Sequence, residues 1–272
     1  MNFGALELER SKAPLAGRTS VPSATTAGLP SMVASTMTSE HTDKAFERDL
    51  YSVRERLLRM GARVHAAVEQ SLKALAERDS GLANQVIDDD AEINRLEVDI
   101  DEACRRILAL RQPAASDLRL ITTALKIVTD LERCGDLAVN IAERVVDLNQ
   151  AAPMPPSPSL YRLAEAAQSQ VKKALDAFVA SDAAAAEEVL AGDDLLDALF
   201  LKFFAEELAL MMEDTRYIRR ATALMFIGKH LERIGDHAMN VAEMVVYMVN
   251  GTDIRHPRSR RLERRPPEPP KG

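Results

Sequence analysis

The hydrophobic residues of this chain recur mainly at spacings of three and four, which is the period of an amphipathic α-helix. Three such stripes follow one another, over about 42–78, 82–111 and 116–148. Turn-forming residues at 79–81 and Gln112–Pro113 separate them. Three helices joined by short connections predict an antiparallel three-helix bundle.

The same pattern then begins again. Residues 230–243 repeat residues 130–143, with nine identities 100 positions apart (236 minus 136, for instance). Earlier in the copy Asp79 matches Asp182, an offset of 103 (182 minus 79), so the second copy lacks about one turn near its second interhelical connection. The pattern therefore predicts an all-α fold of two tandem antiparallel three-helix bundles, six helices in total.

Composition shifts along the chain divide it further. Residues 1–39 are rich in Ser, Thr, Ala, Gly and Pro, and the last residues combine Arg with Pro. Four prolines within 149–158 are incompatible with a helix and indicate a stiff linker. We predict a disordered extension at 1–39, bundles at 40–150 and 159–250, a linker at 151–158 and a basic disordered tail at 251–272. Met37 is an alternative first residue.

Composition narrows the class of protein. Apolar residues make up 46% of the chain but aromatic residues only 4%, which suits helices with a sizeable core. A net charge of −7 argues against nucleic-acid binding by the whole chain. No run of about 18 apolar residues and no signal peptide are present, so we expect no membrane insertion. The two cysteines, Cys104 and Cys134, are too few for a disulfide framework and suggest a reduced, cytosolic protein.

The repeated segment carries a stripe of acidic residues. Its carboxylates lie within about 40° of one another on the helix, a quarter turn or more from the apolar stripe. Arg133 and the other basic residues of this helix should lie on the far side of the acids. Like charges four residues apart cost roughly 0.2–0.5 kcal/mol per pair, so the stripe needs a compensating partner. The retained set is Glu132, Asp136, Asn140 and Glu143 in the first copy and Glu232, Asp236, Asn240 and Glu243 in the second.

The middle helix of each copy offers a facing pair of oxygen donors. The acids further along that helix in the first copy, Glu97 and Asp101, are replaced by Phe200 and Phe204 in the second, so they are not shared. Carboxylate and amide oxygens converging from two adjacent helices suit a hard or borderline cation. The alternative is a solvated acidic face. The predicted metal sites are Asp90 and Asn94 with Glu132 and Asp136, and Asp193 and Asp197 with Glu232 and Asp236.

Other retained residues have less specific interpretations. Gly135 and Gly235, in mid-helix, indicate a close approach of a second helix. His230 and His237 lie round the helix from the acids and are expected at the surface. Arg119 and Arg219 recur between the copies, which fits partner contact, helix capping or simple solvation. The sequence contains no nucleophile with an adjacent base and no Gly-rich phosphate loop.

These motifs closely resemble those of the PhoU family, bacterial accessory and regulatory proteins of phosphate transport. The resemblance rests on residues 100–104, 111–119, 131–136, 231–236 and 251–256, and it covers roughly residues 40–256. It implies two tandem three-helix bundles, often dimeric, in the cytoplasm. It also implies a negative regulator of the phosphate-starvation response, which links the phosphate ABC transporter to the sensor histidine kinase and its response regulator.

The resemblance also bears on the acidic stripes. Some family members bind multinuclear iron or zinc clusters through paired acidic motifs, which here match Glu132 with Asp136, Glu232 with Asp236 and Asp193 with Asp197; others bind none. Mg²⁺ or Mn²⁺ also suits oxygen donors. Because Asn94 is a neutral donor, we expect the first site to be the weaker one.

A non-enzymatic adaptor is the function that the sequence favours, with a homodimer as its expected assembly. The alternative is a metal-dependent phosphate-ester hydrolase that activates water at the carboxylate clusters. Phosphate release by metal-loaded protein, lost in Glu132→Ala and Glu232→Ala, would distinguish the two.

Overall fold

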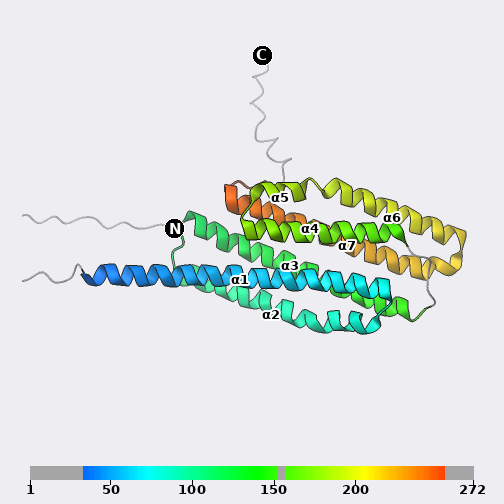
Figure 1. Cartoon of the computed structure of the whole chain (residues 1–272), viewed down its shortest axis with the longest axis horizontal. Helices are drawn as coiled ribbons and strands as arrows, with labels where there is room; N and C mark the ends of the chain where they lie inside the picture. Colours follow the sequence, from blue (N-terminus) through cyan, green and yellow to red (C-terminus); the bar gives the residue numbers. More distant parts are fainter. Residues whose placement is uncertain (1–32, 152–156, 255–272) are drawn as a thin grey trace, which may run out of the picture. The chain divides into compact units, whose positions relative to one another are not determined.

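The computed structural model describes residues 33–151 and 157–254, with side chains from residue 44 onward (Figure 1). The described residues fall into two units, the first ending at His41 and the second beginning at Thr42. The predicted disordered extension up to residue 32, residues 152–156 of the predicted linker and residues 255–272 of the predicted tail lie outside the described residues. The second unit contains both copies of the repeat.

The first copy forms three long helices, as the periodicity predicts. They are α1 (Val33–Glu77), α2 (Ser80–Leu110) and α3 (Ala115–Asn149). Helix α1 begins at Val33, earlier than the start expected near residue 42. Ion pairs and hydrogen bonds between α1 and α2 join their exposed edges, for example Arg63 Nη2 with Glu92 Oε2 at 2.8 Å.

The second copy repeats this arrangement with one change. Its elements are α4 (Pro158–Ala180), α5 (Ala183–Leu190), α6 (Asp193–Glu213), a 3-10 turn η1 (Thr215–Tyr217) and α7 (Ile218–Asn250). The described residues contain no strand, and the predicted fold class of two tandem three-helix bundles is confirmed. The predicted middle helix is divided at Ala191–Gly192 into α5 and α6, so this copy has an extra joint.

The first turn of each copy is built identically. Asp79 caps α2 by accepting from the backbone N–H groups of Gly81 and Leu82 at 2.8 and 3.0 Å. Asp182 caps α5 in the same way, by accepting from the backbone N–H groups of Ala184 and Ala185 at 2.9 and 3.1 Å. The residues just before these caps, Arg78 and Ser181, both have positive φ, 55° and 51°. The two copies therefore share the same turn, which fixes where the helix after it begins in each.

The second connection differs in length between the copies. In the first copy residues 111–114 join α2 to α3, whereas in the second Asp214 alone lies between α6 and η1. This shortening by three residues accounts for the change of offset from 103 to 100. Asp214 accepts hydrogen bonds from both the backbone and the guanidinium group of Arg216, which fixes the compact turn.

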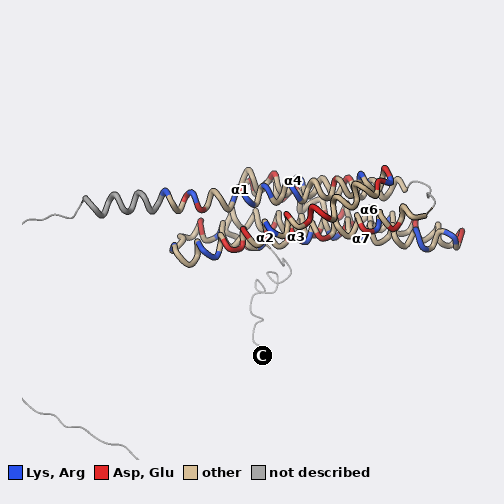
Figure 2. Tube along the Cα trace, turned by 90° about the horizontal axis from the view of Figure 1, so that it is seen from below, with Lys and Arg blue, Asp and Glu red and all other residues tan. Residues whose placement is uncertain are grey.

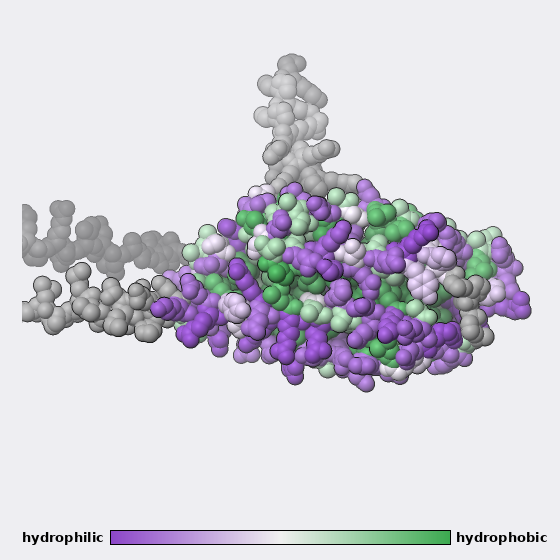
Figure 3. Space-filling model, in the orientation of Figure 1, coloured by the Kyte–Doolittle hydropathy of each residue, from purple (hydrophilic) through white to green (hydrophobic). Residues whose placement is uncertain are grey.

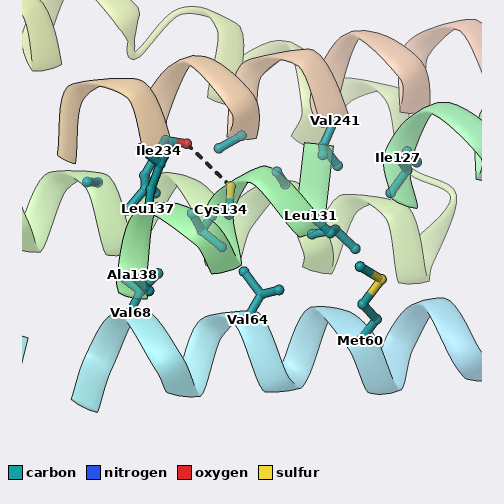
Figure 4. Packing of buried hydrophobic residues seen from close by; sticks show 14 of the residues in the cluster. Met60, Val64, Val68, Ile127, Leu131, Cys134, Leu137, Ala138, Ile234 and Val241 are labelled. Carbon is teal, nitrogen blue, oxygen red and sulfur yellow. Dashed lines mark hydrogen bonds between the residues drawn. The ribbon is translucent and has the colours of Figure 1, made fainter. Parts of the chain in front are cut away.

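The two bundles meet along α3 and α7, which pack against each other over much of their length. The Cys134 thiol lies 4.0 Å from the carbonyl oxygen of Ile234, its own counterpart 100 residues later (Figure 4). A contact between equivalent positions marks a local two-fold axis relating the copies. On the other side of α3, Met60, Val64 and Val68 of α1 complete the buried layer.

Both cysteines are free, and both are buried. Burial raises the pKa of the Cys104 thiol to about 11, with a further contribution from Asp101. Burial raises the pKa of the Cys134 thiol still further. Both groups are therefore protonated at neutral pH and act as small apolar core residues.

Acidic and basic residues are interspersed along α1, α2, α3, α4 and α7 (Figure 2). No helix within the described residues is long and apolar enough to cross a membrane.

Candidate functional site

The first acidic cluster lies between α2 and α3. Asp90 and Asn94 of α2 are joined by a hydrogen bond of 2.8 Å from the Asn94 amide to Asp90 Oδ2. Glu132 and Asp136 of α3 lie close enough to repel Asp90. The structure thus brings the four predicted residues of this site together, on the helices expected from the repeat.

The electrostatics of this cluster are those of crowded acids. Burial raises the pKa of the Asp90 carboxyl; the Asn94 hydrogen bond opposes the rise and Asp136 adds to it. Burial also raises the pKa of Glu132, with Asp136, Glu97 and Asp90 contributing in the same direction. Asp90 Oδ1 is buried without a hydrogen-bond partner among the described residues. A buried, unpaired carboxylate oxygen is unfavourable and is a natural position for a cation or a donor.

Two predictions about this cluster need correction. Arg133 does not lie on the far side of the acids: its guanidinium group is 3.4 Å from Glu132 and 3.3 Å from Asp136. The long arginine side chain reaches back along the helix surface, which helical-wheel angles ignore. Glu97, set aside because the second copy has Phe200 there, lies near enough to Glu132 to raise its pKa.

The second cluster lies between α6 and α7 and has the same plan. Burial is the largest cause of the raised pKa of Asp193, and the nearby charges of Asp197, Asp194 and Glu232 raise it further. Burial and Glu232 raise the pKa of Asp236, while Lys229 lowers it. The four predicted residues are again brought together.

A lysine distinguishes the second cluster from the first. Lys229 Nζ lies 2.6 Å from both carboxylate oxygens of Glu232 and 5.4 Å from the centre of the Phe200 ring. The equivalent residue in the first copy is Thr129, which bonds only to the carbonyl of Leu125. Each cluster is therefore partly neutralised from within, the first by Arg133 and the second by Lys229, and the buried, unpaired oxygen of Asp90 belongs to the first. The expected order of the two sites as cation binders stays a prediction.

The mid-helix glycines allow the helices to approach at both clusters, as predicted. A Cβ atom on Gly135 would lie 3.3 Å from Asp90 Oδ1 and 3.2 Å from the Ile93 side chain. A Cβ atom on Gly235 would lie 2.0 Å from a methyl group of Leu196, which is buried. Each glycine thus lets the acid stripe of one helix meet the donors of the next.

The remaining residues of the retained set behave differently. Asn240 donates to Asp130 Oδ1 at 2.9 Å, so its amide faces α3 instead of the α6–α7 cluster. Asn240 and Glu243 line a separate hollow together with Asp130, and Glu243 lies about two helical turns beyond Asp236 along α7. Asn140 is half-buried and Glu143 is exposed.

The histidines are not simple surface residues. His237 Nδ1 lies 2.9 Å from Asp130 Oδ1, with both side chains only 18% exposed, so the pair bridges α3 and α7. His230 occupies the position equivalent to Asp130 and is half-buried, with Nδ1 unpartnered among the described residues. Burial, with Arg233 and Arg144, lowers the pKa of His230. Angles measured on a single helix therefore could not predict these contacts between the two copies.

The donor chemistry of the clusters suits a hard or borderline cation, because only carboxylate and amide oxygens converge there. The buried, unpartnered oxygen of Asp90 is the structural feature that fits such an ion. Within the described residues, however, no three His, Cys, Asp or Glu side chains are placed as a ready metal-ligand set. Side-chain rotation at Glu132 or Asp136, away from Arg133, would be needed to complete one.

One surface feature has no counterpart in the predictions. Helix α6 exposes a stripe of large apolar side chains, and apolar residues reach the surface over α6 in Figure 3. At the equivalent positions of α2 the ion pair of Asp101 with Arg105, at 3.3 Å, lies between Val98 and Ala109. In the sequence, the stripe is indicated by Phe200 and Phe204, which stand where the first copy has Glu97 and Asp101. The stripe consists of Leu201, Phe204, Leu208 and Met212.

Comparison with known proteins gives a consistent result. Residues 57–145 and 160–245 each match the family model of the PhoU domain. The chain is 44% identical over 217 residues to the phosphate-specific transport system accessory protein PhoU homolog of Pseudomonas putida, covering 79% of this chain and 85% of that protein. The homolog of the same name in Caulobacter vibrioides is 39% identical over 216 residues, covering 79% of this chain and 94% of that protein.

Two solved structures share the fold. The crystal structure of PhoU from Pseudomonas aeruginosa has a TM-score of 0.74 and 44% identity, covering 76% of this chain and 100% of that one. The phosphate transport system regulatory protein PhoU from Streptococcus pneumoniae has a TM-score of 0.71 and 29% identity, covering 77% of this chain and 99% of that one. Both bundles are included in these matches.

The two glycines should respond unequally to alanine. A methyl group at position 235 collides with buried Leu196, and overpacking costs about 1–3 kcal/mol. One at position 135 would lie 3.2 Å from Ile93 and 3.3 Å from Asp90, a tight contact that a shift of a few tenths of an ångström relieves. Both substitutions gain about 1 kcal/mol of helix propensity. We expect Gly235→Ala to be less stable than Gly135→Ala by about 1–2 kcal/mol in urea unfolding. Equal free energies of unfolding would contradict the packing described at the second cluster.

Proposed function

The chain belongs to the PhoU family, and we propose that it is an accessory protein of phosphate transport that represses the phosphate-starvation response. It connects the phosphate ABC transporter to the sensor histidine kinase and its response regulator, at the cytoplasmic face of the membrane. The observation that carries this proposal is the family match across both copies of the repeat, residues 57–145 and 160–245. The chain acts as a non-enzymatic adaptor, so its surfaces should carry the function.

The transporter is the partner that we assign to the apolar stripe of α6. A helix with apolar residues all round is normally buried, yet Leu201 and Met212 are 66% and 81% exposed. Contiguous exposed apolar surface commonly marks a protein–protein contact. The other copy presents Val98, Asp101 and Arg105 at matching positions, so the fold itself does not require the stripe. We assign it to transporter binding because accessory proteins of this family are named for the transport system.

Homodimerisation is a separate prediction from the family resemblance. The same stripe is available to a second copy of the chain when no transporter is present. Sedimentation equilibrium of the purified chain measures this directly, without bearing on repression.

Deleting the gene should raise alkaline phosphatase expression in phosphate-rich medium, and the wild-type gene should restore repression. A Leu201→Glu/Met212→Glu variant should not restore it. Burying an unpaired carboxylate at an interface costs on the order of 3 kcal/mol, or about a hundredfold in affinity. Both side chains are exposed, so the variant should fold normally, as circular dichroism would verify.

The matched control is Val98→Glu on α2, which adds a carboxylate at the position equivalent to Leu201 and is 58% exposed. It should restore repression. Unchanged expression on deletion would contradict the regulatory function itself. Full repression by the α6 variant would contradict only the assignment of the stripe.

A cation at the acidic clusters is the second element of the proposal. The buried, unpaired oxygen of Asp90 and the mutual repulsion of Asp90, Glu132 and Asp136 support it. Iron or zinc is the ion expected from the family, and Mg²⁺ or Mn²⁺ suits the all-oxygen donors equally. The cation would relieve the repulsion between α2 and α3 and so strengthen the first bundle.

Elemental analysis of protein purified without chelator should detect one of these metals. The content should fall in Glu132→Gln/Asp136→Asn, which removes two charges from the first cluster. Asp88→Asn/Asp89→Asn makes the same charge change at exposed positions of α2 and should leave the content unchanged. Metal-free wild-type protein, or equal content in the two variants, would show that the first cluster is a solvated acidic face.

A further inference from the structure

A hollow of about 500 Å³ lies between the end of α3 and the start of α7, and none of the residues of the acidic clusters or the α6 stripe lines it. It is unusual in its charge, because four guanidinium groups meet there. Arg144 lies 3.3 Å from Asp147, and Arg216 lies 2.6 Å from Asp214. The arginines of the hollow are Arg144, Arg216, Arg219 and Arg220.

The repeat provides an internal comparison for this cluster. The pseudo-symmetric position, at the end of α7 and the start of α3, has the same backbone plan. There Ser116 replaces Arg216, Leu120 replaces Arg220 and Met244 replaces Arg144. The packing of these helix ends therefore does not require four arginines, and the cluster is particular to one end of the molecule.

Only one arginine recurs at both ends, as Arg119 and Arg219, and Arg119 shows which structural role this position can have. Arg119 donates through Nε to the carbonyl oxygen of Met248, at 3.5 Å, near the C-terminal end of α7. At the α3 end the last carbonyl groups are bound instead by Arg78, whose Nη2 lies 2.7 Å from the Ala151 oxygen and 3.4 Å from that of Leu148. Because Arg78 binds these carbonyl groups, the end of α3 does not need Arg219 as a cap. Arg219 forms no ion pair among the described side chains. It is available to a ligand.

The walls of the hollow suggest what kind of anion it takes. Phe226 lines it with 54% of its surface exposed, where the first copy has Lys126. Leu148, Ala151 and Ala223 add apolar surface. A volume of this size is typical of sites for whole organic ligands and far exceeds what one inorganic phosphate fills. An exposed aromatic ring beside guanidinium groups is the combination that stacks a base and binds its phosphates.

We propose that this hollow binds a nucleoside phosphate, with the arginines on the phosphate groups and Phe226 against the base. Arg219 and Arg220, in the first turn of α7, contact the phosphates where the positive end of the helix adds to their attraction. Arg216 is held at the rim by Asp214, in the turn that the three-residue shortening creates. The site would make the adaptor responsive to a nucleotide.

Isothermal titration of the full chain with ATP and, separately, with inorganic phosphate tests the proposal. ATP should bind more tightly than inorganic phosphate. Arg219→Ala/Arg220→Ala should weaken ATP binding by at least about tenfold, because each charge-assisted contact contributes about 1.5–3 kcal/mol. Phe226→Ala should weaken ATP binding and leave the affinity for inorganic phosphate unchanged.

The control with the same change of charge is Arg95→Ala/Arg105→Ala on the exposed face of α2, which should bind ATP like the wild type. Unfolding midpoints of all variants verify that they fold. The proposal is overturned if ATP does not bind, if its affinity survives loss of Arg219 and Arg220, or if the α2 control loses as much. Inorganic phosphate binding as tightly as ATP would overturn the assignment to a nucleoside phosphate.

Discussion

The packing of α3 on α7 is the constraint on which the rest of the molecule depends. Where the two helices meet, Cys134 touches Ile234, its equivalent in the other copy, so each bundle presents the same face to its partner. Such an isologous contact lets one duplicated sequence bury its own surface. It also fixes the opposite faces of both helices, so that each acid stripe is held against the donors of its own bundle, and the start of each helix lies beside the end of the other.

Within this symmetric frame the two copies have diverged at three places. The first cluster keeps a buried, unpaired oxygen at Asp90, whereas Lys229 neutralises Glu232 in the second. Helix α6 is apolar where α2 is charged. Four arginines line the hollow at one end of the α3–α7 pair, where the equivalent positions at the other end hold one. Because each difference lies on a common backbone plan, one copy indicates what packing alone requires, and we propose that a partner or ligand acts where the other copy differs.

Much of this arrangement could be predicted from the sequence, because helical periodicity and the repeat are both local or pairwise patterns. The helices, the pairing of Asp90 with Glu132 and the close approach at Gly235 followed from them. Contacts across the two-fold axis did not, since the angle of His237 on its own helix says nothing about Asp130 on another. The reach of Arg133 and the break at Gly192 depend on side-chain length and packing, which a helical wheel omits.

The central claim is that the second copy, through α6, binds the phosphate transporter while the first copy does not. Amide hydrogen exchange of the chain, with and without the purified transporter in detergent, measures this directly. Slower exchange over residues 195–212 on adding the transporter, with no change over residues 92–109, is the predicted result. Equal protection of both segments, or protection of neither, would contradict it.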